Sequence, residues 1–311
     1  MSIRVASLGV LAAVLAAATV YAQAEARATL AVEYLVVEVP RWARENHCFS
    51  CHNNGDGARV LYVAARLGYL VPDAALADTA KWLLEPGKWD NNGGNPGFSD
   101  KKLARIQFAA ALSEAYVSGA IPGRALREAA ASLLPYQEAD GSWQVDAGAV
   151  GSPATYGTSL ATCMARLTLE KADGAAFKDA IARADRWLLQ NKPRSLIDAA
   201  AALLALPGSE TVKRRSLDFI LPAQSSDGGW GPHPLAASEP FDTAVVLLAL
   251  RKLDQPERTR GPIARGRSFL LAQQQPGGGW PETTRPPGAQ SYAQHISTSA
   301  WATLALILTR E

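Results

Sequence analysis

Cysteine is scarce in this sequence, which has three cysteines, four histidines and two methionines among 311 residues. A small and odd number of cysteines does not indicate a disulfide framework. An excess of charge of one sign is also missing, because 31 basic and 29 acidic side chains leave a formal net charge of +2. A near-neutral chain is not expected to bind nucleic acid as its main partner. Apolar residues, at 48%, are numerous enough for one large core or two ordinary ones.

Long apolar runs are lacking except near the N-terminus, where residues 5–20 follow a short basic start. Small residues at Ala22 and Ala24 come next, and this order is typical of a secretory signal peptide. The run is shorter than the roughly 20 residues that cross a bilayer. We therefore expect residues 1–24 to be a leader cleaved near Ala22 to Ala24, residues 25–311 to be periplasmic or secreted, and no integral membrane span after the leader. An uncleaved anchor is the alternative.

A repeat is present in three copies, each with Gln six residues and Gly two residues before a Trp, at Gln137–Trp143, Gln224–Trp230 and Gln274–Trp280. An amphipathic segment precedes each copy, and a more uniformly apolar segment follows it. The repeating unit is therefore predicted to be a helical hairpin with an outer helix, a Gly-Trp turn and a buried inner helix. We expect the turns to be structural, because Gly permits tight backbone paths and Trp covers a large apolar area.

Degenerate copies of the hairpin fill the rest of the chain. Segments around Trp82 and Trp187 have the outer character and lead into apolar segments at residues 103–116 and 196–206. The first hairpin is inferred from residues 32–42 and 58–70, with residues 48–56 in its turn. Repeats with a period of roughly 30 to 50 residues stack on one another, because each cannot bury its apolar face alone. The sequence therefore predicts an all-α fold, a single α/α toroid of about six helical hairpins (an α6/α6 barrel).

The three Gln-x-x-x-Gly-x-Trp turns resemble the repeat of squalene-hopene cyclases and of the wider prenyltransferase and squalene oxidase repeat superfamily. Residues 241–250 and 297–306 are similar to the inner helices of that family. The resemblance is loose over residues 72–308 and good over residues 213–308. It implies an α/α barrel around a central apolar cavity, and an enzyme acting on an isoprenoid is one function that it suggests.

The catalytic motif of squalene-hopene cyclases is not reproduced. Their Asp-x-Asp-Asp-Thr-Ala stretch corresponds to residues 239–244, where Phe241 stands in place of the central acid. A phenyl ring cannot donate a proton, so proton-initiated cyclisation is not expected. Asp242 is the remaining candidate catalytic residue, and its alternative role is to stabilise the N-terminal end of an inner helix. The Asp-x-Cys pair of the zinc-dependent prenyltransferase branch is absent from the sequence.

The sequence Cys48-Phe49-Ser50-Cys51-His52 has the pattern of a haem c attachment site. Two thiols three residues apart can reach the two vinyl groups of one porphyrin edge, and the next histidine supplies an axial imidazole. Export agrees with this interpretation, because c-type haem is attached outside the cytoplasmic membrane. A disulfide between Cys48 and Cys51, free thiols, or a zinc site that includes His52 are the alternatives.

Three residues are candidates for a sixth haem ligand, and the third of them is His233 in a proline-rich turn. His295 precedes the last inner helix as His52 precedes the first, so ring closure would bring the two histidines face to face. Met164 is the second candidate, although a methionine inside an inner helix is also explained by core packing. Since inner helices begin at one rim of the toroid, His52, Asp242 and His295 are expected around one mouth of the cavity. A ligand or a redox partner would dock there.

Three functions follow as hypotheses. The first is an exported haem c protein that transfers electrons, senses redox state or binds an apolar molecule. The second is an enzyme of the terpenoid cyclase or prenyltransferase type acting on an isoprenoid, and the third is a non-catalytic binding scaffold, with zinc as a structural staple. Whether the protein is an enzyme is left open by the sequence.

Overall fold

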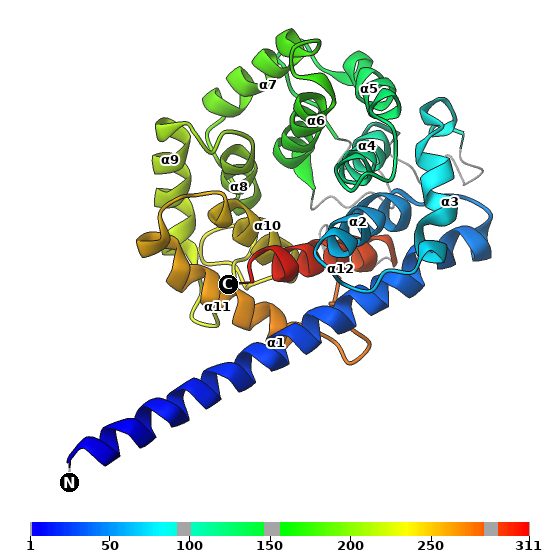
Figure 1. The fold of residues 1–311 in the computed structure, drawn as a ribbon. Coiled ribbons are helices and arrows are strands. Elements are labelled where there is room, and N and C mark those ends of the chain that lie inside the picture. The colour runs from blue at the N-terminus through cyan, green and yellow to red at the C-terminus, as the bar shows by residue number, and fades with distance from the viewer. Residues whose placement is uncertain (1, 92–100, 146–155, 283–291, 311) are drawn as a thin grey trace.

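This computed structural model describes residues 2–91, 101–145, 156–282 and 292–310, with the side chains of the first helix described at residue 19 and from residue 21 onward. Within these ranges the regular structure is helical and contains no strand. Helices alternate along the chain between an outer and an inner ring (Figure 1). The all-α toroid of six hairpins is confirmed.

The outer helices are α1 (Ser2–Asn46), α3 (Asp73–Leu83), α5 (Gly123–Ala131), α7 (Lys178–Gln190), α9 (Glu210–Ile220) and α11 (Pro256–Gln273). The inner helices are α2 (Ala58–Arg66), α4 (Lys101–Val117), α6 (Gly157–Asp173), α8 (Leu196–Ala205), α10 (Pro240–Arg251) and α12 (Tyr292–Leu308). A π-helical segment, η1 (Cys51–Gly57), joins α1 to α2. Short 3₁₀ turns lie at Pro86–Lys88, Leu134–Tyr136 and Leu221–Ala223.

Composition explains the two rings. In α10 the residues from Pro240 to Leu250 are all buried, as expected for a helix that is apolar on every side. In α9 only one stripe is buried, formed by Val212, Ser216, Leu217 and Ile220, and the rest of the helix carries charged side chains toward solvent. The uniformly apolar helices therefore form the inner wall, and the amphipathic helices cover it.

The three Gly-Trp turns fasten each hairpin internally. Their tryptophans are fully buried, and each indole Nε1 donates to the backbone oxygen ten residues earlier, in the outer helix of its own hairpin or the turn that follows it. Each Trp backbone nitrogen donates to a hydroxyl on the following inner helix, at 2.9 Å in all three copies. The turn residues are structural, as the sequence predicts.

The glutamine of each of these three turns bonds its hairpin to the outer helix of the next one. The Gln137 amide donates to the backbone oxygen of Ala180 in α7 at 2.9 Å, and the Gln224 amide donates to that of Pro262 in α11 at 2.9 Å. The third copy closes the ring, because Gln274 donates to the backbone oxygen of Arg27 in α1 at 3.0 Å. Helix α1 is therefore the outer helix of the first hairpin and the docking surface of the last turn.

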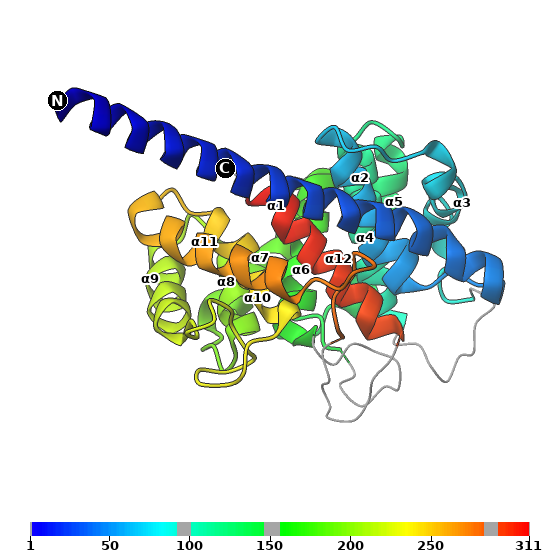
Figure 2. The ribbon, with the colours of Figure 1, turned by 90° about the horizontal axis from the view of Figure 1, so that it is seen from below.

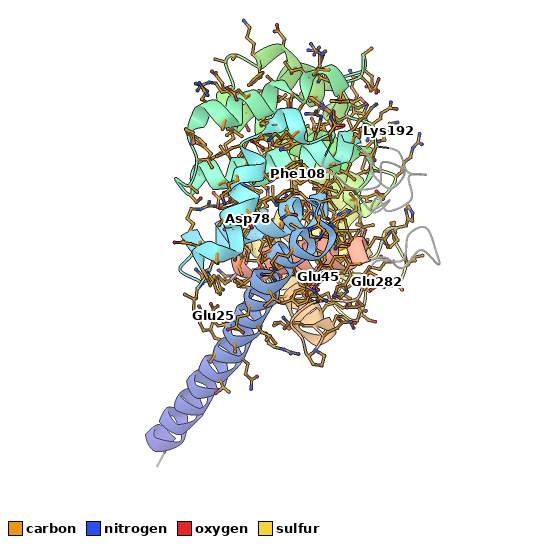
Figure 3. All side chains as sticks on the ribbon, turned by 90° about the vertical axis from the view of Figure 1, so that its right-hand side faces the viewer. Glu25, Glu45, Asp78, Phe108, Lys192 and Glu282 are labelled. Carbon is orange, nitrogen blue, oxygen red and sulfur yellow. The ribbon has the colours of Figure 1, made fainter. Side chains whose placement is uncertain are left out.

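Views from the other sides agree with this closure. Figure 2 shows α1 running alongside α11 and α12, and Figure 3 shows the stretch of α1 between Glu25 and Glu45 lying along the ring. The N-terminal part of α1 extends beyond the ring in Figure 1. Among the residues whose side chains are described, no helix is both long enough and apolar enough to cross a membrane. The predicted leader stays a prediction.

Candidate functional site

The Cys-x-x-Cys-His sequence lies where α1 ends and η1 begins. Ser50 caps η1, because its hydroxyl accepts from the backbone nitrogen of His52 at 3.2 Å. Wide helical turns of this kind are rare and occur frequently at functional sites. The cap places Cys48 before η1, and Cys51 and His52 in its first turn.

The thiols and the imidazole have different surroundings. No disulfide joins Cys48 to Cys51, both are partly exposed, and Trp42 Nε1 donates to Cys48 Sγ at 3.3 Å. His52 is 5% exposed, with its Nε2 3.6 Å from Cys51 Sγ. Two reachable thiols beside one imidazole fit the donor set that haem c requires. Iron coordination would have to uncover His52, and haem attachment stays a prediction.

The candidate sixth ligands have other neighbours. His295 Nδ1 is 3.5 Å from Glu282 Oε2, and its ring meets the ring of Tyr34 edge-on at 6.0 Å. Met164 Sδ accepts from the guanidinium of Arg59 at 3.4 Å. No group of three or more His, Cys, Asp or Glu side chains in the described ranges is arranged to hold a metal ion.

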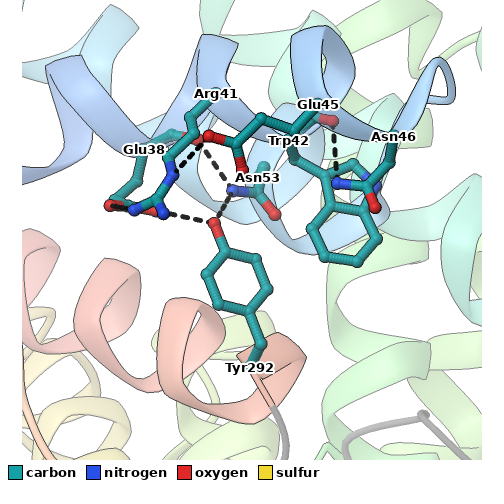
Figure 4. A network of polar contacts seen from close by, with 7 residues as sticks. All are labelled: Glu38, Arg41, Trp42, Glu45, Asn46, Asn53 and Tyr292. Carbon is teal, nitrogen blue, oxygen red and sulfur yellow. Dashed lines mark hydrogen bonds and ion pairs between the residues drawn. The ribbon is translucent and has the colours of Figure 1, made fainter.

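A polar network that the sequence analysis missed joins α1, η1 and α12 at the ring seam (Figure 4). The Tyr292 hydroxyl donates to Glu38 at 2.6 Å, and Asn53 donates to the Tyr292 oxygen at 2.9 Å. Arg41 pairs with Glu38 at 2.9 Å. Burial, followed by the hydrogen bond to Glu38, raises the pKa of Tyr292, so its phenol remains a donor. The residue after His52 therefore helps to lock the first hairpin to the last.

A second missed residue, Asp56, is buried at the end of the toroid where the inner helices begin. It is 1% exposed and accepts hydrogen bonds from Gln107 at 2.7 Å and from Ser297 at 2.6 Å. Tyr156 OH lies 3.4 Å from its other oxygen, and burial, then Asp56, raises the pKa of that phenol well above its ordinary value. Asp56 thus joins η1, α4, α6 and α12. The neighbouring Gly55 permits this close approach of η1 to α4, because a Cβ there would lie 2.9 Å from Gln107 Cβ.

Several described side chains are buried at the rim where the inner helices begin, which is where the mouth of the cavity was expected. His52 is buried, and Tyr156, Phe241 and Asp242 are each 0% exposed. The Phe241 ring lies 6.3 Å from Tyr156 and 5.8 Å from Trp301, so the side chain in place of the family's acid is part of an aromatic plug. Asp242 lies in the first turn of α10, where a carboxylate stabilises the helix dipole. Its catalytic role stays a prediction.

A cavity of about 390 Å³ is present toward the other rim, where the inner helices end. Its apolar walls include Val63, Leu167, Leu204, Leu248, Leu304 and Leu308. The one carboxylate among its lining residues is Glu114, which pairs with Lys171 at 2.8 Å and with Arg66 at 3.0 Å. Burial acts to raise the pKa of Glu114, but these two cations outweigh burial and hold the pKa below its ordinary value.

Comparison with known proteins relates the C-terminal repeats to one family. Residues 194–311 match the squalene-hopene cyclase C-terminal domain. Drimenyl diphosphate synthase of Streptantibioticus cattleyicolor is 38% identical over 90 residues, which cover 28% of this chain and 16% of that protein. Lanosterol synthase of Aspergillus fumigatus is 32% identical over 77 residues, covering 22% of this chain and 10% of that protein. Each match therefore covers less than a fifth of the relative's length.

Solved structures extend the likeness of fold over nearly the whole chain. The type II terpene cyclase MstE of Scytonema superposes with a TM-score of 0.58 at 17% identity, covering 92% of this chain and 98% of that one. The ent-copalyl diphosphate synthase of Streptomyces platensis gives a TM-score of 0.54 at 22% identity, covering 81% of this chain and 50% of that one. At these identities the likeness establishes the terpene-cyclase toroid and no activity.

Proposed function

We propose that this protein is a terpenoid-cyclase-like toroid that binds an isoprenoid or a similarly apolar molecule in the cavity where its inner helices end. The single observation that carries the proposal is the cavity itself, about 390 Å³ in volume and walled by aliphatic side chains. Small-molecule sites are typically concave, largely apolar and about 300–1,000 Å³ in volume. The match of residues 194–311 to the squalene-hopene cyclase C-terminal domain supports an isoprenoid over other apolar molecules.

The side chains of Phe241 and Glu114 favour binding over proton-initiated cyclisation. An acid that protonates an alkene must be protonated and must face the substrate. Phe241 occupies the family's acid position, and Glu114, the carboxylate among the cavity lining residues, is ion-paired with a lowered pKa. We therefore propose a binding or carrier function for the cavity.

Binding of farnesol, followed by isothermal titration calorimetry, tests this function. Val117 lines the cavity, is 42% exposed and belongs to the last turn of α4, so Val117→Trp should fill the entrance without disturbing the core. Leu189 is 41% exposed on the outer helix α7, which makes Leu189→Trp a matched control. We expect saturable binding to the parent protein and to Leu189→Trp, and a loss of at least about tenfold in Val117→Trp. Equal binding by all three would contradict the proposal.

A second function, tethered haem c in an exported protein, is supported by the two partly exposed thiols beside His52. Cys48 and Cys51 would hold the porphyrin through thioether links, and His52 would be an axial ligand. The group supplies one-electron redox chemistry, and a redox partner protein would follow from it. Pyridine haemochrome absorbance of protein made with the cytochrome c maturation machinery tests this, with Cys48→Ser/Cys51→Ser as the control. A colourless protein with the mass of the bare chain would exclude haem.

A further inference from the structure

One buried cation in the cavity has no counter-ion in hydrogen-bond contact among the described residues. Arg59, in the first turn of α2, lines the cavity and is 4% exposed. Its guanidinium lies over the Trp301 ring, 4.1 Å from the centroid, and its Nη1 donates to Met164 Sδ at 3.4 Å. In the described part of the chain, its Nε and Nη2 atoms are buried without any hydrogen-bond partner.

The Nε and Nη2 atoms form one edge of the guanidinium. Two other buried arginines show how this edge pairs with acceptors in this protein. Arg105 directs Nε and Nη2 onto the two oxygens of Asp90, at 3.0 and 2.7 Å. Arg166 directs the same two atoms onto Asp185, at 2.8 and 3.5 Å. Side-on pairing of this edge with two oxygens is the geometry in which arginine recognises carboxylates and phosphates. In Arg59 the edge is of the same kind, but no oxygen of a described residue is bonded to it.

Nearby polar groups do not supply the missing acceptor. Asp56 is three residues from Arg59 on the same helical segment, but its oxygens are bonded to Gln107, Ser297 and Tyr156. Asp56 and Arg59 both act on the pKa of the Tyr156 phenol, which Asp56 raises and Arg59 lowers. A buried guanidinium with two unused donors is costly, because desolvation is not offset by hydrogen bonds.

The wider lining of the cavity is also basic. Besides Arg59 it includes Arg66, Lys171, Arg251 and Lys252, against Glu114 alone. Cations in the last turns of helices stabilise the helix dipole, and this accounts for the basic residues at the rim. It does not account for Arg59, which lies where η1 runs into α2, away from the last turn of the helix.

We propose that the cavity binds an amphiphile with an oxyanion head, a carboxylate or a phosphate monoester, two oxygens of which pair with the Nε and Nη2 edge of Arg59. The apolar body then lies along the aliphatic walls toward the rim, and this part rests on the binding function proposed above. Arg59 and Arg66 are separated by seven residues of helical backbone, or about 10 Å, so the head binds at the inner end.

Three probes with the same hydrocarbon chain separate the head from the body. Farnesoic acid carries a carboxylate, farnesyl monophosphate carries a phosphate, and farnesol carries no charge. In calorimetric titrations of the full chain we expect at least one anion to bind about tenfold or more tightly than farnesol. The stronger of the two anions identifies the head group. Farnesol binding as tightly as both anions would overturn the oxyanion proposal but leave the apolar site standing, whereas binding of none would reject both.

Substitution of the guanidinium assigns the preference to Arg59. Arg59→Met should reduce the affinity for the anion to that for farnesol, with farnesol binding little changed, and Arg127→Met on the exposed face of α5 is the control. If circular dichroism shows that Arg59→Met does not fold, Arg59→Lys replaces it. Lysine keeps the charge but cannot present two donors on one edge, so a loss of about tenfold is expected. An undiminished preference in the folded variant would refute the role of Arg59.

Discussion

At the scale of single residues, local geometry should affect stability most at the turn glycines and reactivity most at the cysteines. Gly278 has φ +98, a conformation that L side chains rarely adopt, and an added Cβ would lie 2.5 Å from the backbone oxygen of Leu30. Its neighbour Gly277 has open space around the same position. Gly278 therefore combines a positive φ with a close approach to α1, and Gly277 has neither.

Gly278→Ala should destabilise the protein, because it strains the turn and pushes the last hairpin away from α1. We expect a loss of about 2 kcal/mol or more in the free energy of unfolding, measured by urea titration. Gly277→Ala, the matched control, should change it by less than about 0.5 kcal/mol. Equal effects of the two substitutions would mean that the turn does not dock on α1 as described.

The three cysteines should differ in reactivity. Burial raises the pKa of the Cys163 thiol to about 12, and the side chain is 0% exposed. Because the thiolate is the nucleophile, Cys163 should resist iodoacetamide at pH 8 while Cys48 and Cys51, both partly exposed, are alkylated. Peptide mapping by mass spectrometry measures this, with urea-unfolded protein as the reference for full labelling. Rapid labelling of Cys163 in the folded protein would refute its burial in α6.

At the scale of helices, the three turn glutamines show how one docking contact varies around the ring. The Oε1 atoms of Gln137 and Gln224 accept from Arg183 and Arg265 on the next outer helix. On α1 the equivalent position is Leu30, and the Oε1 of Gln274 is buried without a hydrogen-bond partner among the described residues. The joint between the last hairpin and α1 thus lacks a bond that the other two joints have.

Leu30→Arg should supply that bond. We expect a gain of about 1 kcal/mol in the free energy of unfolding, because a buried acceptor gains a donor. Val37→Arg, at a position of α1 that is 57% exposed, is the control and should stay within about 0.5 kcal/mol of the parent protein. A destabilised Leu30→Arg protein would show that α1 is not in the register of α7 and α11.

Glu114 links α2, α4 and α6 at the cavity rim, and its lowered pKa makes this link depend on pH. A carboxylate whose pKa is lower in the folded state adds stability that is fully present above its unfolded pKa of about 4.5 and is lost as pH falls through its folded value. Glu114→Gln should therefore be less stable than the parent protein at neutral pH. The difference should shrink below about pH 4.5, as measured by thermal unfolding across pH. A constant difference would mean that the ion pairs do not form.

At the scale of the whole molecule, the order of helices followed from the sequence because repetition needs no knowledge of long-range contacts. The Gln and Trp spacing fixed three hairpins, and the alternation of amphipathic and uniformly apolar segments supplied the others. The end of the toroid at which the cavity lies did not follow from the sequence. Open space depends on side-chain volumes from six inner helices at once, and aromatic side chains such as Tyr156 and Phe241 are buried at the rim where the mouth was expected.

Single polar residues were also beyond the sequence pattern. Asp56 and Asn53 are part of a polar run that is ordinary in a turn, and their partners, such as Ser297 and Tyr292, are more than 200 residues away. Arg59 precedes an apolar helical stretch, and its burial depends on Trp301 and Met164 from two other hairpins. The candidate haem residues were found because their pattern is local.

The central claim is that an apolar ligand occupies the interior of the ring at the end where the inner helices finish. Photo-crosslinking with a diazirine-bearing farnesyl analogue, followed by peptide mapping, tests it most directly. We predict labels on the peptides that contain Leu248 and Leu304, which line the cavity, and protection of both by excess farnesoic acid or farnesol. Labels confined to the outer helices, or unaffected by the competitor, would contradict the account.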